Sequence, residues 1–247
     1  MAATPDTVAA EVTSGAGCKT RSRGRFSGRQ GRLLNGARTW NGPGFGPRAL
    51  TGMSHGAAGF AYALASLAAA TGREDFVAAA SECLAFENAT YDPGRMNWPD
   101  LRGDGEPRWA CQWCHGAAGI GLARAGMIKR GARVGGLDPS IITTDIGRSV
   151  GGVERAWPGR VDTLCCGTLS GIELLREAAG VLRRDDLRDL ATRRLKTIVA
   201  SASSSGDYRW NAGDRRFNLG LFRGLAGVGY TLLREIDASL PNVLIWD

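Results

Sequence analysis

The chain repeats one short phrase four times, and this repetition constrains its fold more than any other feature of the 247 residues. In each copy a glycine-rich opening precedes an apolar run of helical length. The openings are His55-Gly-Ala-Ala-Gly59, His115-Gly-Ala-Ala-Gly119, Cys166-Gly-Thr-Leu-Ser-Gly171 and Arg223-Gly-Leu-Ala-Gly227. Successive copies begin 60, 51 and 57 residues apart. Periods of this length indicate stacked repeats, each built from one supersecondary unit.

Each repeat is predicted to be a hairpin of two helices. Small and apolar residues at helical spacing predict helices over 52–70, 74–87, 139–157, 164–182, 187–201 and 221–235. Turn-forming residues predict loops over 91–107 and 203–218. Few β-branched runs with a period of two occur, so strands should be minor and the fold class all-α. Because one hairpin cannot bury its own apolar face, neighbouring hairpins must stack into a solenoid or close into a ring.

The glycines in each opening indicate where successive hairpins meet. We expect every copy to place a Gly-x-x-Gly element at the start of its first helix, because glycine allows close backbone approach and a tight turn. In a ring of such hairpins, the inner helices present the same end to one side. The side chains beside the glycines would then converge on one mouth; they are His55, Cys114, His115, Cys165, Cys166 and Arg223.

Three of these side chains carry thiols, which suits a zinc site. Zinc takes tetrahedral thiolate and imidazole ligands, and three protein ligands leave one position open for a substrate. Cys165 and Cys166 can reach one metal if the backbone turns between them, and Cys114 occupies the same place one repeat earlier. A disulfide is the alternative, which a reducing compartment disfavours. We therefore predict that Cys114, Cys165 and Cys166 bind zinc.

His55 and the remaining cysteines have competing interpretations. His55 is one of only two histidines, and at this repeat-defining position it is either a functional group or a structural hydrogen-bonding residue. Cys83 and Cys18 are interpreted as small apolar residues. Cys111, three residues before Cys114, could complete a closed, structural four-cysteine site. The repeat position favours a functional role for His55 and leaves the four-cysteine site open.

The positive charge of the chain is concentrated at its N-terminus. The net charge is +7, and the first 50 residues hold eight Lys and Arg against two acidic residues. Residues 1–45 are predicted to be a disordered basic tail, because they are rich in Gly, Ser, Thr and Arg with few large apolar groups. Such a tail could bind nucleic acid or an acidic surface, but we interpret it as a solvated arm and expect no nucleic-acid partner. Residues 46–247 form the predicted folded domain.

The sequence shows no targeting or membrane-spanning segment. No run of eighteen or more apolar residues occurs, so no transmembrane helix is expected. The N-terminus also lacks the apolar central region of a signal peptide. We therefore expect a cytoplasmic protein, in a compartment where thiols stay reduced.

Several ordered motifs resemble those of the lanthionine synthetase C-like (LanC-like) family. Trp113–Gly121 resembles the family's Trp-Cys-x-Gly-x-x-Gly motif, and Ser54-His55-Gly56 resembles its Ser/Ala-His-Gly motif. Leu164–Gly167 resembles its Leu-Cys-His-Gly motif, with a cysteine in place of the histidine. The stretches 97–102 and 240–246 look like those of the bifunctional class II (LanM-type) synthetases.

The resemblance covers about residues 48–247 and implies an α/α toroid with a central zinc. In this family the enzyme adds cysteine thiols of a dehydrated precursor peptide to dehydroalanine or dehydrobutyrine residues, forming thioether rings. Carried over by position, Cys114, Cys165 and Cys166 would bind Zn²⁺, and His55 would be the catalytic acid/base. A three-cysteine site resembles a subgroup of these synthetases whose members tend to accept varied peptides.

The chain also departs from the family pattern. A full toroid of this family has about seven hairpins, whereas four openings are present, so we expect an incomplete barrel with exposed apolar flanks that resembles the C-terminal cyclase part of a LanM-type enzyme. The dehydratase portion and the family's active-site aspartate would belong to the missing part. We therefore expect weak or no ring closure by this chain alone.

The alternative function is that of a non-catalytic, zinc-stabilised helical-repeat protein that binds a peptide or a thiol. In either case, His115 is interpreted as lining the mouth without binding metal.

Overall fold

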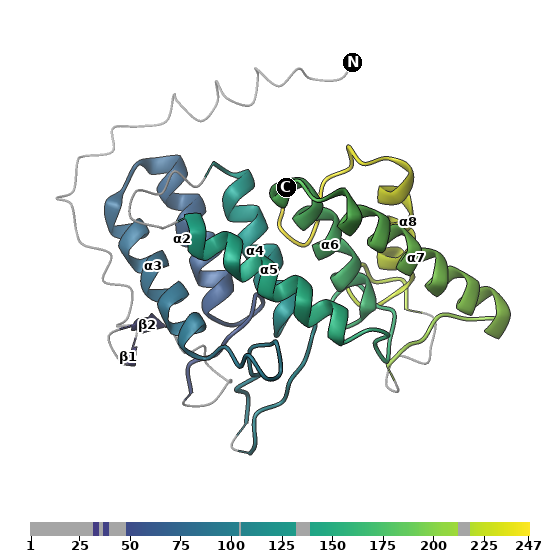
Figure 1. The fold of residues 1–247 in the computed structure, drawn as a ribbon, viewed down its shortest axis with the longest axis horizontal. Helices are drawn as coiled ribbons and strands as arrows, with labels where there is room; N and C mark the ends of the chain where they lie inside the picture. The colour runs from purple at the N-terminus through teal and green to yellow at the C-terminus, as the bar shows by residue number, and fades with distance from the viewer. Residues whose placement is uncertain (1–31, 35–36, 40–47, 104, 132–138, 212–217) are drawn as a thin grey trace, which may run out of the picture.

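A computed structural model describes residues 32–34, 37–39, 48–103, 105–131, 139–211 and 218–247 (Figure 1). Over these residues the chain forms seven helices: α2 (Ala57–Thr71), α3 (Glu74–Ala89), α4 (Ala117–Lys129), α5 (Pro139–Arg155), α6 (Thr168–Leu182), α7 (Asp185–Ser205) and α8 (Leu225–Ile236). The strands β1 (Arg32–Leu34) and β2 (Ala37–Thr39) form one short antiparallel pair, with Arg32 opposite Thr39. The predicted all-α class, with minor strands, is confirmed.

The helices pair in chain order and then stack on one another. α2 packs against α3, α4 against α5 and α6 against α7, so each pair is a hairpin. The first helices of the hairpins also contact each other in succession, from α2 to α4 to α6 and on to α8 (Figure 1). This arrangement gives an inner row of first helices and an outer row of second helices, as expected for stacked hairpins.

α4 lies at the centre of the inner row. Every residue from Ala117 to Met127 is buried, because α2, α5 and α6 surround the helix. Small residues allow this close packing: a Cβ at Gly121 would lie 2.6 Å from the Ser149 side chain and 2.7 Å from Leu174. A helix that is buried on all sides is usually hydrophobic all round. Arg124 is an exception, because it is a charged residue buried within α4.

The inner helices begin later than the sequence predicted. Helices expected from residues 52, 164 and 221 begin at Ala57, Thr168 and Leu225. At each start the first helical N–H donates to a carbonyl seven residues earlier: Ala57 to Leu50 at 2.9 Å, Thr168 to Val161 at 2.9 Å and Leu225 to Asn218 at 2.8 Å. The residues between are a turn that folds back on the helix start, so they cannot also be helical.

The second opening requires a glycine immediately before its helix, α4. Gly116 has φ +85°, a conformation that side chains with a Cβ rarely adopt. A Cβ there would also collide with the carbonyl of Ala110. Replacement of Gly116 by any other residue would therefore displace the turn that carries Cys114 and His115.

The third opening corrects the expectation of a Gly-x-x-Gly element in every copy. In the other copies a Cβ on the second glycine would collide with a carbonyl six residues earlier, and these pairs are Gly59 with Met53, Gly119 with Trp113, and Gly227 with Leu221. The matching position in the third copy is Ser170, whose buried hydroxyl donates to the Gly167 carbonyl at 2.8 Å. Gly171 lies one residue later and instead faces Val153 of α5.

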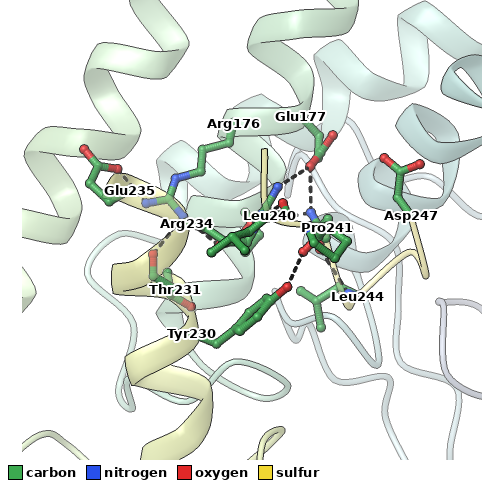
Figure 2. Close-up of polar contacts among 12 residues, drawn as sticks. Arg176, Glu177, Tyr230, Thr231, Arg234, Glu235, Leu240, Pro241, Leu244 and Asp247 are labelled. Carbon is green, nitrogen blue, oxygen red and sulfur yellow. Dashed lines mark hydrogen bonds and ion pairs between the residues drawn. The ribbon is translucent and has the colours of Figure 1, made fainter. Parts of the chain in front are cut away.

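The C-terminal segment closes the fold by crossing the inner helices. Figure 2 shows Tyr230 donating to the Pro241 carbonyl at 2.7 Å and Arg234 to the Leu240 carbonyl at 3.1 Å. Further along, Leu244 and Ile245 are fully buried. The Ile245 carbonyl accepts a hydrogen bond from Tyr62 of α2, and Ile245 also lies against Gly126 of α4. The chain end therefore returns from α8 to α2 and α4.

The remaining expectations about the chain ends are tested only in part. The predicted tail, residues 1–45, lies outside the described residues except for β1 and β2, of which β2 contacts α3. Its disorder and the domain boundary at residue 46 remain predictions.

The last helix, α8, has an exposed apolar surface, because Leu225, Leu233 and Ile236 are exposed. Within the described ranges, no helix combines the length and apolar character needed to cross a membrane.

Candidate metal centre

The glycine-rich openings converge through backbone hydrogen bonds between successive repeats. Ser54 N donates to the Cys114 carbonyl at 3.3 Å, which joins the first opening to the second. Trp113 N donates to the Cys165 carbonyl at 2.9 Å, and Cys165 N donates to the Phe222 carbonyl at 2.8 Å. All four openings are thus connected in chain order, which confirms the predicted convergence of the repeats.

Three sulfur atoms meet at the centre of these contacts. Cys114 precedes α4, and Cys165 and Cys166 precede α6. The Sγ atoms of Cys114 and Cys166 are 3.8 Å apart, those of Cys165 and Cys166 are 3.2 Å apart, and all three lie within 4.8 Å of one another. Tetrahedral zinc with bonds of about 2.3 Å places its sulfur ligands roughly 3.8 Å apart. The spacing and the soft donor set therefore fit one zinc ion.

The protons of the three thiols are distributed unequally. Hydrogen bonds with Cys114 and Cys165 lower the pKa of Cys166, and the positive charges of Arg223 and Arg102 act in the same direction. Hydrogen bonds with its two neighbours, together with burial, raise the pKa of Cys165. The pKa of Cys114 is also raised, to about 11. Cys166 is therefore the most readily ionised of the three thiols, and a metal bound by all three would displace the protons of Cys114 and Cys165.

His55 lines a mostly apolar cavity next to α2. Its Nε2 is 3.0 Å from the Ser54 hydroxyl, and its ring centroid is 6.1 Å from that of His115. Burial lowers the pKa of His55, and the positive charge of Arg102 lowers it further. The imidazole is therefore neutral at neutral pH. The cavity has a volume of about 470 Å³ and is also lined by Phe60 and Trp246.

His115 does not belong to the sulfur cluster and does not line a mouth. Its side chain is 1% exposed, and its Nδ1 lies 3.8 Å from Oδ1 of Asp100. Burial is the main reason that the pKa of His115 is lowered, although the negative charge of Asp100 opposes this. As predicted, His115 is not in the group of side chains that could share a metal. The prediction that His115 lines the mouth was wrong, because its ring is buried beside Asp100.

Arg102 is a charged residue of the site that sequence reasoning missed. Its guanidinium donates to both carboxylate oxygens of Asp100, at 2.9 and 2.6 Å. Burial raises the pKa of Asp100, but these hydrogen bonds outweigh it and hold the pKa below its usual range. The cation is close enough to Cys114, Cys166 and His55 to influence the pKa of each. The only sequence signal for Arg102 is its place in the stretch 97–102, which resembles the LanM-type enzymes but does not indicate a role for the arginine.

Buried polar side chains position the first two openings. Oε1 of Glu87 accepts hydrogen bonds from Gly52 N at 2.8 Å and Ala58 N at 3.1 Å, on either side of His55. Oδ1 of Asn97 accepts one from Ala117 N at 2.8 Å, just after Cys114. The turns that carry the candidate catalytic and metal-binding residues are therefore held by side chains of the preceding α3 and loop.

The other cysteines lie outside the cluster. Cys83 is fully buried in α3, in agreement with its interpretation as an apolar core residue. Cys111 is not among the three sulfurs that can share a metal, and burial raises its pKa to about 11. This placement disfavours the closed four-cysteine site. Cys18 lies outside the described residues.

Together these features define a class of helical-repeat proteins in which glycine-rich turns bring together three cysteines that could hold a metal ion. The chain belongs to the lanthionine synthetase C-like family, which its sequence matches over residues 39–245. None of the curated proteins matches it.

The structure is similar to that of nisin cyclase, with a TM-score of 0.56 at 16% sequence identity. The match covers 77% of this chain and 47% of nisin cyclase, so the chain spans about half the length of that relative. The shared fold is an α/α toroid of helical hairpins, as the resemblance implied.

Proposed function

We propose that the chain is the zinc-dependent cyclase part of a class II (LanM-type) lanthipeptide synthetase. It would act in the cytoplasm on a precursor peptide that a dehydratase portion has already dehydrated. The observation that carries this proposal is the meeting of three sulfurs from two repeats. The turn that carries His55 is hydrogen-bonded to the turn that carries Cys114, through Ser54 N and the Cys114 carbonyl. Membership of the family supports the same chemistry.

Cys114, Cys165 and Cys166 would hold the zinc. Zinc bound there would lower the pKa of a peptide thiol, ordinarily about 8.5, so that the thiol is bound as a thiolate. The peptide sulfur then forms a bond to the β-carbon of the dehydroamino acid, and the electron pair of the double bond moves into an enolate. His55 takes up the thiol proton and returns a proton to the α-carbon, which completes the thioether.

Two arginines would offset the negative charge of this site. Three thiolates around Zn²⁺ give a net charge of −1, and a substrate thiolate makes it −2. Such a sulfur is electron-rich and should be a strong nucleophile. Arg102 and Arg223 both act electrostatically on Cys166. They would stabilise the charged site without binding the metal themselves.

The proposal is tested by replacing zinc with cobalt, whose visible spectrum reports its ligands. We expect a thiol-containing model peptide to change the cobalt–thiolate absorption, because the fourth position is open. The same peptide with serine in place of cysteine should leave the spectrum unchanged. Identical spectra with and without the thiol peptide would indicate a closed site and contradict the proposal.

His55→Asn should separate proton transfer from thiol binding. A positioned acid or base typically contributes at least about 100-fold to a rate. We therefore expect ring closure on a dehydrated peptide, which should already be slow in this chain, to fall about 100-fold. Mass spectrometry after thiol alkylation measures this rate, and the cobalt spectrum serves as the control for thiol binding. An unchanged rate with intact thiol binding would exclude His55 from the reaction.

A further inference from the structure

A cavity of about 620 Å³ adjoins the sulfur cluster at Cys166. Its walls are the loop 108–112, the end of α5, the turn 157–161 and the start of α6. Cys166 and Gly167 form part of the lining, so the cavity shares a wall with the metal centre. Neither the ring-closing chemistry nor the positioning of His55 uses this space.

The charge of the lining has one sign. Three arginines line the cavity, Arg108, Arg160 and Arg194, whereas the described lining residues include no aspartate or glutamate. Arg108 and Arg160 are exposed, and within the described part of the chain no ion pair involves either of them. Two solvent-accessible arginines therefore line the cavity, and neither forms an ion pair with a carboxylate of the described residues.

Arg194 is the buried member of this set. It is 8% exposed, lies 4.7 Å over the ring of Trp157 and donates to the Val153 carbonyl at 3.2 Å. Burial lowers its pKa, although the nearby Glu154 carboxylate, which is not part of the lining, opposes this. The contacts with Trp157 and Val153 fix the guanidinium in the wall, so an anion in the cavity would meet a preorganised cation.

Apolar surface accompanies these charges. Trp109, Trp157, Val153 and Ile172 contribute to the same lining. A small inorganic ion would use only the arginines, whereas an acidic amino-acid side chain has methylene groups for the apolar surface and a carboxylate for the guanidinium fork. The combination favours a peptide residue over a free ion.

We propose that this cavity binds an acidic side chain of the substrate peptide, in the stretch that flanks the reacting cysteine. The inference rests on the proposed function, because it assumes that the peptide thiol occupies the metal centre. Each residue of an extended peptide spans about 3.3–3.6 Å. Since Cys166 borders both sites, the acidic residue would lie close to the cysteine in the peptide sequence.

The test measures the binding of four short synthetic peptides to the full, zinc-loaded chain. All are acetylated and amidated, so that the tested side chain is the only carboxylate. Two contain cysteine flanked by either Glu or Gln, and two contain serine in place of the cysteine. We expect the Glu–cysteine peptide to bind about fivefold more tightly than its Gln partner at low ionic strength, as is typical of partly exposed charge pairs.

Matched variants assign the preference to the cavity. The double variant Arg108→Gln/Arg160→Gln should bring the two cysteine peptides to nearly equal affinity. Arg155→Gln should leave the preference unchanged, because Arg155 is exposed at the end of α5 but does not line the cavity. Arg194 is not substituted, since its buried contacts make a folding defect the expected result.

The outcomes distinguish this inference from the proposed function. Equal binding of the Glu and Gln peptides by the unmodified chain, with serine peptides still weaker, would overturn the cavity proposal and leave the cyclase proposal intact. A Glu preference that is also retained by the double variant would overturn it as well. In a third outcome, the double variant loses the preference for Glu over Gln, but the unmodified chain binds the serine and cysteine peptides equally. This result would support the anion site and contradict thiol binding at the metal.

Discussion

Cys166→Ser should lose its zinc. The Sγ atom of Cys166 lies 3.8 Å from that of Cys114 and 3.2 Å from that of Cys165, so Cys166 is one of the three sulfurs that can share a metal. The binding of zinc to a structural site of typically four ligands has a free energy of about 10–16 kcal/mol. If the ligands contribute equally, the loss of one thiolate lowers the affinity for zinc by a factor on the order of 1,000. We expect about one zinc per purified unmodified chain and almost none in the variant, measured by metal analysis after dialysis against a weak chelator.

Cys111→Ser is the matched control for this loss. Cys111 lies three residues before Cys114 but outside the group of sulfurs that can share a metal. The variant should retain its zinc and its response to an added thiol peptide. Loss of zinc from Cys111→Ser would show that the site is a closed four-cysteine centre. Absence of zinc from the unmodified chain would overturn the metal centre itself.

The convergence of the thiols could be predicted because it follows from repetition. Cys114 and Cys166 occupy neighbouring positions in successive copies of one phrase, and stacked copies place equivalent residues side by side. The start of each inner helix could not be predicted in the same way. Residues 52–56 lack a residue that would stop a helix, apart from the glycines that also occur within the inner helices. The helix starts at Ala57 because of long-range contacts, such as the bond from Ala57 N to the Leu50 carbonyl and the bond from Ala58 N to Glu87.

The charged residues of the site were hidden for different reasons. Arg102 lies in a long loop, where no periodicity relates a residue to the rest of the chain, so its approach to the thiols depends on the path of that loop. Arg124 lies in an apolar helix, where a single arginine would normally be read as the solvent-facing position. The structure instead places Arg124 and both of its acidic partners at 0% exposure.

This buried ion pair network links two hairpins to the turn that carries His55. Arg124 of α4 donates to Glu87 of α3 at 2.9 Å and to Asp145 of α5 at 3.1 Å. Glu87 in turn accepts the hydrogen bonds of Gly52 N and Ala58 N. Removal of the arginine would leave two carboxylates buried without their shared cation.

Arg124→Met should therefore destabilise the chain by about 3–5 kcal/mol, the usual cost of removing one partner from a buried pair. Urea unfolding followed by circular dichroism measures the change. The matched control is Arg148→Gln, which removes a 38% exposed partner of the same Asp145, at 3.3 Å. An exposed pair contributes at most about 1 kcal/mol, so equal stability of the two variants would contradict the proposed importance of the network.

The pH dependence of Arg124→Met identifies Glu87 as the source of the loss. Burial raises the pKa of Glu87 above its ordinary value of 4.5, and the charge of Arg124 opposes this rise. Without Arg124 the pKa must rise further, so the folded state binds a proton at pH values where the unfolded chain has released it. The stability of the variant should then increase as the pH falls from 8 toward 5, because protonation removes the buried charge.

The double variant Arg124→Met/Glu87→Gln is the control. The glutamine amide cannot ionise, but its oxygen can still accept the hydrogen bonds of Gly52 N and Ala58 N. The stability of the double variant should therefore vary with pH no more than that of the unmodified chain.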